Sequence, residues 1–196
     1  MKLHTVELSG RFVQLIPLQK QHVAALHAAG RDAEIWTYFF QQPDTLQKMQ
    51  SFVDDALNEQ ERGNELPFAI VEKTSRDIVG STRLLGYLPS HRSVEIGATW
   101  LSPTAWNTAI NAECKLLLLR HCFETLNLLR VQFTTDERNV RSQRAIEKLG
   151  AHREGVMRCH RVLAHNGFVR NSVLYSIVRD EWPSVQARLE TRLEPR

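Results

Sequence analysis

The sequence predicts a mixed α/β sheet, flanked by helices, in a single domain that spans residues 1–196. Strand-like segments follow one another through short turns between Pro67 and Leu101, which favours antiparallel pairing in the first half of the sheet. Helical and strand patterns then alternate as far as Leu149, as in a parallel or mixed sheet. A chain of 196 residues that is 42% hydrophobic and 24% charged suits one globular domain with a sizeable core.

The first third of the chain is expected to form one strand and two helices. Phe12–Leu18 alternates well enough for a strand. Gln21–Ala29 is typical of a short helix that ends at Gly30. Asp44 is a good N-cap for a longer helix, Thr45–Arg62, whose apolar residues recur at helical spacing.

Three strands follow, and the pattern predicts that they pair as a meander. They are Pro67–Glu72, Ile78–Leu85 and Ser93–Leu101. Gly80 lies inside the second of them and indicates a β-bulge.

The alternating region begins with a long amphipathic helix, Ala109–Thr125. A strand at Arg130–Thr135 and a helix at Val140–Leu149 come next, and Gly150 is placed to end that helix. We expect the helical cysteines to pack as small apolar groups.

The last part of the chain is expected to form a two-stranded ribbon and a helix. Gly155–Ala164 can pair with Phe168–Val178 through the turn at residues 165–167, because Asn-Gly favours the dihedral angles of a tight hairpin. Asp180–Leu193 is typical of a charged terminal helix.

Composition excludes several classes of protein. The net charge of +3 permits an anionic ligand, but the arginines are scattered and do not indicate nucleic acid. Cys114, Cys122 and Cys159 form no C-x-x-C pair, so neither a disulfide framework nor a metal site is expected. No apolar run is long enough to span a membrane, and the N-terminus lacks the apolar region of a signal peptide. The cytoplasm is therefore the default location.

The chain is organised around the junction of the third meander strand with the long helix, Glu95–Glu124. A strand that opens onto a helix N-terminus can bind an anion, because the first N–H groups of the helix have no partner within it and the dipole there is positive. This junction suggests a cofactor that carries phosphate.

Four stretches together resemble the GNAT superfamily of acyl-CoA-dependent N-acyltransferases, and within it the branch of ribosomal-protein N-terminal acetyltransferases. They are Leu8–His22, Glu95–Trp106, Thr134–Gly155 and Asn166–Trp182, and they are spread over most of the chain. The resemblance implies a central strand that splays from its parallel neighbour, acetyl-CoA as cosubstrate and an amine as acceptor.

The resemblance also implies where acetyl-CoA binds. Its pantetheine arm should pair with the backbone of Thr99, Trp100 and Leu101, like an added strand. Its diphosphate should lie on the N–H groups of the loop and helical turn that follow, which comprise Trp106, Asn107, Thr108, Ala109, Ile110, Asn111 and Ala112.

That loop departs from the family pattern, because family members usually have glycine at about the positions of Asn107 and Ala109. Asparagine still enters the region of positive φ readily. A Cβ at residue 109 either crowds the phosphate or costs about 1 kcal/mol or more if φ is positive. Two outcomes stay open: the loop binds CoA in a shifted conformation, or it no longer binds CoA.

The helix after the next strand carries further candidate cofactor ligands. The resemblance implies that the Asn139 amide meets the pantetheine arm, while the simpler interpretation is an N-cap shared with Asp136. Ser142 either faces the cofactor or is a solvated serine of the first turn. A basic face on this helix is either solvated or attracts the 3′-phosphate of CoA; it comprises Arg138, Arg141, Arg144 and Lys148.

Acyl transfer to an amine requires a proton acceptor, donors for the oxyanion and stabilisation of the leaving thiolate. Glu95 is the candidate base, or the group that attracts the cationic amine; otherwise it is a surface glutamate. Ser142 and Tyr175 are the candidates for assisting the thiolate. Tyr175 could instead line the pantetheine channel or be a half-buried strand residue. Glu154 and His160 are weaker acid–base candidates.

The acceptor and its pocket stay open at this point. An aromatic cluster is either a satellite core or the wall of an acceptor pocket; it comprises Trp36, Tyr38, Phe39 and Phe40. The leading hypothesis is acetyl transfer to a peptide or protein α-amine. The alternatives are a small-molecule amine, such as a polyamine or an aminoglycoside, and a non-catalytic acyl-CoA-binding module. The ribbon strands and exposed aromatic residues are compatible with a homodimer.

Overall fold

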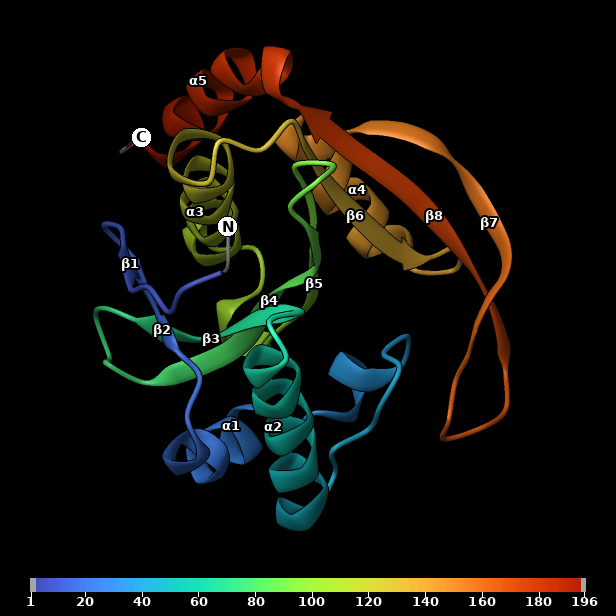
Figure 1. The fold of residues 1–196 in the computed structure, drawn as a ribbon. Helices are drawn as coiled ribbons and strands as arrows, with labels where there is room; N and C mark the ends of the chain where they lie inside the picture. The colour runs from blue at the N-terminus through green and yellow to red at the C-terminus, as the bar shows by residue number, and fades with distance from the viewer. Residues whose placement is uncertain (1–2, 195–196) are drawn as a thin grey trace.

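The computed structural model describes residues 3–194, which form one eight-stranded mixed sheet with helices on both faces (Figure 1). Neighbours are antiparallel except for β5 and β6, which are parallel. The predicted fold class is therefore confirmed. In their order across the sheet, the strands are β1 (Leu8–Ser9), β2 (Val13–Pro17), β3 (Glu65–Glu72), β4 (Ile78–Leu88), β5 (Ser93–Leu101), β6 (Arg130–Asp136), β8 (Val169–Val178) and β7 (His152–Val162).

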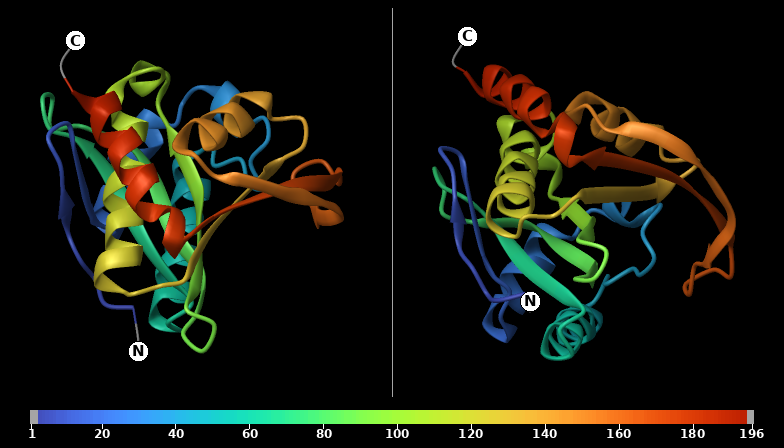
Figure 2. Two further views of the ribbon diagram at one scale, coloured as in Figure 1. Left: turned by 90° about the horizontal axis from the view of Figure 1, so that it is seen from above. Right: turned by 45° about the horizontal axis from the view of Figure 1, so that its top comes forward.

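Two layers of helices enclose the sheet (Figures 1 and 2). One face is covered by α1 and α2, and the other by α3, α4 and α5. The helices are α1 (Val23–Ala29), α2 (Leu46–Glu61), α3 (Ala109–Arg120), α4 (Val140–Leu149) and α5 (Trp182–Leu193). A π-helical turn, His121–Thr125, continues α3 to the predicted end of the long helix.

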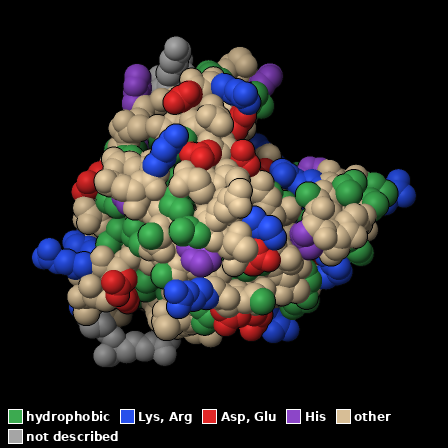
Figure 3. All heavy atoms as spheres, turned by 90° about the horizontal axis from the view of Figure 1, so that it is seen from below, with side chains coloured by type: hydrophobic (Ala, Val, Ile, Leu, Met, Phe, Trp, Pro, Cys, Tyr) green, Lys and Arg blue, Asp and Glu red, His purple; other side chains and the backbone are tan. Residues whose placement is uncertain are grey.

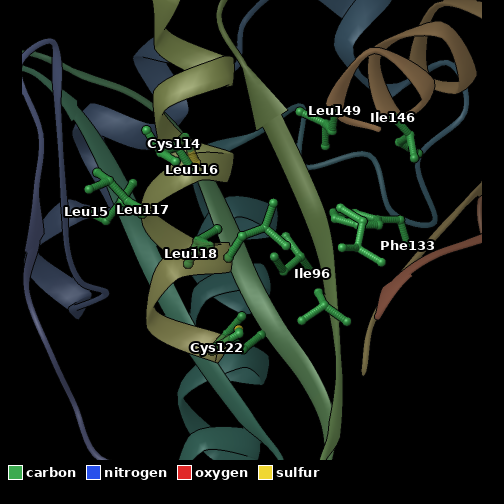
Figure 4. Packing of buried hydrophobic residues seen from close by; sticks show 14 of the residues in the cluster. Leu15, Ile96, Cys114, Leu116, Leu117, Leu118, Cys122, Phe133, Ile146 and Leu149 are labelled. Atoms are coloured by element: carbon green, nitrogen blue, oxygen red, sulfur yellow. The ribbon is translucent and has the colours of Figure 1, made fainter. Parts of the chain in front are cut away.

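Each face of the sheet has its own hydrophobic core. The larger core lies beneath α3, where Leu118 and Cys122 pack in one layer with Ile96 of β5 and Ile146 of α4 (Figure 4). Cys114 and Cys122 are free thiols with no exposed surface. The prediction that they pack as small apolar groups is confirmed.

The β1–β2 turn is fastened to α3 by one buried carboxylate. Glu113 accepts hydrogen bonds from the backbone N–H groups of Arg11, Phe12 and Val13 at 2.7, 2.6 and 2.7 Å. A Cβ added at Gly10 would lie 2.3 Å from the Glu113 carboxyl carbon, so a glycine is needed at this close approach. This contact holds β1 and β2 against α3, the helix that follows β5.

The structure corrects several predicted boundaries. The short strand β1 was not predicted, and β4 continues beyond the predicted end to Leu88. Thr45, not Asp44, caps α2: its hydroxyl accepts from the backbone N–H of Lys48 at 3.2 Å, while the Asp44 carboxylate pairs with the Lys48 ammonium at 2.8 Å. Asp44, one residue before the N-cap, thus stabilises the first turn of α2 through its ion pair with Lys48. The predicted bulge at Gly80 is confirmed by a register shift against β3.

The ribbon of β7 and β8 extends beyond the rest of the sheet, and β7 forms the edge (Figures 1 and 3). Figure 3 shows hydrophobic side chains on this projecting lobe. Val162, Phe168 and Val169 near its tip are exposed. Within residues 3–194, no helix has the length and apolar character needed to cross a bilayer.

Candidate active site

β5 and β6 separate after a short parallel contact, and a cavity of about 620 Å³ lies in the gap. Residues 95–101 line one side and residues 133–136 the other, with α3, α4, the α1–α2 connection and the ribbon completing the walls. The volume falls in the range of roughly 300–1,000 Å³ that is typical of ligand sites. The splayed central strands implied by the resemblance are therefore present.

A bulge in β5 shapes this cavity. The register against β4 shifts between the pairs Ser81–Trp100 and Arg83–Gly97, so β5 carries one extra residue there. Ala98 has a φ of 47°, a conformation that costs an L-residue about 1–2 kcal/mol. Because β6 pairs only with the first three residues of β5, the backbone groups beyond them that face the gap are left without a strand partner. An extended ligand can pair with them.

Thr99 and Lys115 form a buried polar pair beside the bulge. The Lys115 ammonium donates to the Thr99 hydroxyl at 2.6 Å, and the Thr82 and Thr99 hydroxyls are 2.7 Å apart. Lys115 is 6% exposed and lines the cavity, and burial lowers its pKa. The sequence analysis missed this lysine; the signal was a cation at the start of an apolar helical run.

The loop between β5 and α3 accommodates its lack of glycine. Asn107 adopts a φ of 58°, the conformation that asparagine tolerates best among non-glycine residues. Ala109 is the first residue of α3 and is not among the residues with positive φ. The Thr108 hydroxyl caps this helix by accepting from the Ile110 N–H at 3.2 Å. Neither residue 107 nor residue 109 thus requires glycine for its backbone conformation.

The predicted cofactor residues divide into two groups. Those that line the cavity are Thr99, Trp100, Leu101, Trp106, Asn107, Thr108, Asn111, Asn139 and Ser142. Those that do not are Ala109, Ile110 and Ala112. The side chains of Ile110 and Ala112 are buried in the core, so these residues could contact a cofactor only through their backbone N–H groups. Asn111 and Lys115, one turn apart, share the face of α3 that meets the cavity.

Asn139 caps α4, because its side-chain oxygen accepts from the Ser142 N–H at 3.0 Å. Asn139 also lines the cavity, and its NH₂ group donates to no residue in 3–194. Asp136 accepts from the backbone and guanidinium of Arg138. Burial opposes ionisation of Asp136, but these hydrogen bonds prevail and lower its pKa.

The basic residues of α4 are not equivalent. Arg141 pairs with Glu34 at 3.0 Å and lies 3.9 Å above the Trp106 ring. Arg144 and Lys148 line the cavity and make no ion pair with any residue in 3–194. These two charges are the ones that a phosphate could use.

Glu95 lines the cavity near the start of the gap. Its carboxylate accepts from the Thr134 hydroxyl at 2.6 Å and from the Gln132 amide at 3.2 Å. A Cβ at Gly97 would lie 3.0 Å from a Glu95 oxygen, so the glycine leaves room for the carboxylate. Two hydrogen bonds thus fix an acidic group at the cavity wall.

Tyr175 does not line the cavity. It has no exposed surface, and its hydroxyl donates to Glu147 of α4 at 3.0 Å. Burial, together with the Glu147 carboxylate, raises the pKa of the phenol. Of the two residues predicted to assist the thiolate, the structure brings Ser142, but not Tyr175, to the cavity.

The weaker acid–base candidates are held elsewhere. Glu154 accepts from both ends of the Arg130 guanidinium at 2.5 and 2.6 Å and from Ser176 at 2.7 Å. These contacts lower the pKa of Glu154 to about 2, which makes it a poor base. Burial and two neighbouring arginines lower the pKa of His160, which is not among the cavity-lining residues.

The aromatic cluster is divided between the core and the cavity wall. Trp36 is core: it is 3% exposed, lies 4.9 Å from the Trp100 ring and donates to the Gly30 carbonyl. Tyr38, Phe39 and Phe40 line the cavity. The α1–α2 connection therefore contributes an aromatic wall.

Comparisons with known proteins agree with this geometry. YoaA, an uncharacterised N-acetyltransferase of Bacillus subtilis, is 24% identical over 81% of this chain and 89% of its own length. The crystal structure of a putative acetyltransferase from T. thermophilus is 38% identical, covers 99% of this chain and 100% of its own, and has a TM-score of 0.90.

A third relative was solved with a ligand. Mycobacterium smegmatis RimJ in complex with CoA-disulfide shares the fold, with a TM-score of 0.79, 22% identity and coverage of 96% of this chain and 93% of its own. The model of the acetyltransferase (GNAT) domain family matches residues 13–152. The chain therefore belongs to the GNAT acetyltransferase family and is an acyltransferase.

Proposed function

We propose that this protein transfers an acetyl group from acetyl-CoA directly to a primary amine, and that the amine is a peptide or protein N-terminus. The observation that carries the proposal is the cavity between the splayed strands, with Glu95 in one wall and the N-terminus of α3 opening onto it. The four stretches that resemble N-terminal acetyltransferases support the choice of acceptor.

The chain has groups that fit acetyl-CoA. Unpaired backbone of β5 suits the amides of the pantetheine arm. The first turn of α3 offers N–H groups and a positive dipole end to the diphosphate, and Arg144 and Lys148 add charge. RimJ, which shares this fold, is itself in complex with CoA-disulfide. The backbone angles of residues 107 and 109 count against a degenerate, non-binding loop.

Glu95 acts on the acceptor. Its carboxylate attracts the ammonium form of the amine and takes up the proton that must leave before nitrogen can attack, directly or through one water. Hydrogen bonds from Thr134 and Gln132 hold the carboxylate in place for this step. The nitrogen then forms its bond to the acetyl carbon as the carbon–sulfur bond breaks.

Backbone donors stabilise the charge that develops on the acetyl oxygen. The β5 bulge at Ala98 is fixed by its pairing with β4, so its N–H groups need no reorganisation during the reaction. Ser142 lines the cavity, and its hydroxyl donates to the departing sulfur in this proposal.

Calorimetry with acetyl-CoA and thiol-release assays on a panel of amines test the proposal. The panel contains peptides with free N-termini, a polyamine and an aminoglycoside. We expect binding, and turnover that is greatest with peptides. No binding at millimolar acetyl-CoA would refute the enzyme, binding without turnover would favour a non-catalytic module, and preference for a small amine would replace the acceptor class.

A further inference from the structure

One buried arginine in the cavity wall forms no ion pair with any of the described residues. Arg170, near the start of β8, is 6% exposed and lines the same cavity as Glu95. Its Nε donates to the Ser172 hydroxyl at 2.9 Å. No carboxylate among residues 3–194 lies within 4.0 Å of its guanidinium. The two terminal nitrogens, with four of its five N–H groups, donate no hydrogen bond to any residue in 3–194.

Arg83 shows what a structural arginine looks like in this fold. It is 4% exposed, and it pairs with Glu65 at 3.0 Å, donates to the Phe52 carbonyl at 3.2 Å and lies over the Phe52 ring. Removing a charge from water is costly unless a partner of opposite charge and hydrogen bonds compensate it. Arg83 has both within the protein. Arg170 has one hydroxyl and the more distant charges of Asp136 and Glu95, so its terminal nitrogens stay available to a ligand that enters the cavity.

The nearest candidate partner within the protein is already engaged. The Asp136 carboxylate is held by Arg138 through two guanidinium hydrogen bonds of 2.9 and 2.7 Å. Arg138 in turn lies over the rings of Phe168 and Tyr38, at 3.7 and 5.5 Å, and so links the ribbon to the α1–α2 connection. The charge of Asp136 raises the pKa of Arg170, against the effect of burial, but Asp136 forms no ion pair with Arg170 within 4.0 Å.

Strand alternation places Arg170 on the acceptor's side of the sheet. Side chains alternate between faces, and Tyr175 of β8 meets Glu147 of α4, so residues of even number in β8 point to the opposite face. In β6, Gln132 and Thr134 point to that same opposite face and contact Glu95. Arg170 thus shares a face with the candidate base.

The phosphate-binding candidates belong to the other face. Arg144 and Lys148 are on α4, which covers the sheet on the side of α3 and α5 (Figure 1). Glu95 is close enough to Arg170 to act on the pKa of its guanidinium, which burial lowers. Arg161, directly opposite Arg170 in the β7–β8 pairing, also lines the cavity and adds a second positive charge.

We propose that Arg170, assisted by Arg161, binds a carboxylate of the acceptor while Glu95 receives its amine. The preferred acceptor is then an amine that carries a carboxylate nearby, either as a free amino acid or as an acidic residue at the start of a peptide. This inference rests on the proposed function, because it specifies the acceptor of the same site. The planar guanidinium fork matches a carboxylate through two parallel hydrogen bonds.

Matched ligands test the inference by binding alone. Each is titrated by calorimetry into protein saturated with CoA: a Glu-Ala-Ala amide against a Gln-Ala-Ala amide, and β-alanine against propylamine. We expect the acidic member of at least one pair to bind about 10- to 100-fold more tightly, as for a charge-assisted hydrogen bond in a dry site. Arg170→Gln should abolish that preference, while Arg170→Lys should retain part of it.

Arg158→Gln is the matched control: it removes the same charge, but Arg158 is exposed on β7 and does not line the cavity. It should leave the preference unchanged, and the affinity for CoA should be the same in all variants. If only the peptide pair shows the preference, the carboxylate belongs to a peptide; if only β-alanine and propylamine differ, it belongs to a free amino acid. Equal affinity of the acidic and neutral members in both pairs, or an equal loss for both in Arg170→Gln, would overturn the inference. Failure of the proposed function gives a different result: no amine is acetylated, even if the acidic ligands bind more tightly than the neutral ones.

Discussion

The Lys115 ammonium donates to the Thr99 hydroxyl at 2.6 Å across the gap between α3 and β5. This contact joins the helix whose N-terminus opens onto the cavity to the strand whose bulge forms its wall. Among residues 3–194 the ammonium has no carboxylate partner. The cost of burying it is therefore only partly offset within the protein.

Lys115→Met should change how stability depends on pH. Burial lowers the pKa of Lys115 in the folded protein, so the unfolded chain binds the proton more strongly. The wild type should gain stability as pH rises from the lowered folded pKa towards about 10.4, the ordinary lysine value, and Lys115→Met should lack this increment. Thermal unfolding of both proteins between about pH 8 and pH 10.5 measures the difference. Parallel curves would contradict the assigned burial.

Substitutions at Asn107 should separate backbone conformation from side-chain chemistry. Asn107→Gly keeps the φ of 58° available and should leave the affinity for CoA within about threefold. Asn107→Val places a β-branched residue in that region, at a cost of about 1–2 kcal/mol, and should weaken CoA binding about tenfold. Calorimetry gives both values. A large loss in Asn107→Gly would show that the amide itself binds the ligand.

Ala109→Gly is the companion test. Ala109 begins α3 without a positive φ, so glycine there should lower helix stability by up to about 1 kcal/mol and should not tighten CoA binding. Tighter binding would mean that the Cβ crowds the diphosphate after all.

Glu113→Gln should destabilise the protein by about 2–3 kcal/mol, because one amide oxygen cannot accept three backbone N–H groups and its NH₂ group opposes them. Urea unfolding measures the loss. Gly10→Ala should destabilise the same contact, whereas Gly155→Ala, where an added Cβ meets nothing within 4 Å, serves as the matched control. If both alanine variants unfold at the same urea concentration, the Glu113 contact is not needed for stability.

Ser142→Ala and Tyr175→Phe should act differently on turnover. Ser142 lines the cavity and Tyr175 does not, so Ser142→Ala should lower kcat about tenfold, the rate effect of roughly 1.4 kcal/mol. Tyr175→Phe should leave kcat unchanged and cost about 1 kcal/mol of stability through the lost bond to Glu147. The reverse pattern would restore Tyr175 as the residue that assists the thiolate.

The chain order of the elements could be predicted because it depends on local patterns. The run of residues 93–101, the helix that follows and the glycine at 150 each carry their own signal, and the positive φ at Asn107 follows from the residue type. The separation of β5 from β6 was predicted from the family resemblance, because the sequence of neither strand indicates where their pairing stops.

The site residues that sequence reasoning missed depend on distant contacts. Lys115 meets Thr99 only after α3 packs on β5, and Arg170 lines the same cavity as Glu95 only because β8 pairs with β6 in the sheet. The positive φ of Ala98 has no residue-type signal, because alanine rarely adopts it. Tyr175 was predicted in the correct strand, but its side chain lies on the face of β8 that packs against α4, where its hydroxyl contacts Glu147.

The most direct test of the central claim is thiol release from acetyl-CoA by the wild type and by Glu95→Gln, with the best peptide amine. Glutamine keeps the size of Glu95 and one of its two acceptor oxygens, but it cannot accept the proton. We expect amine-dependent thiol release in the wild type, a mass gain of one acetyl group on the peptide, and a fall in kcat of about 100-fold or more in Glu95→Gln with unchanged CoA affinity. Equal rates in the two proteins would contradict the account.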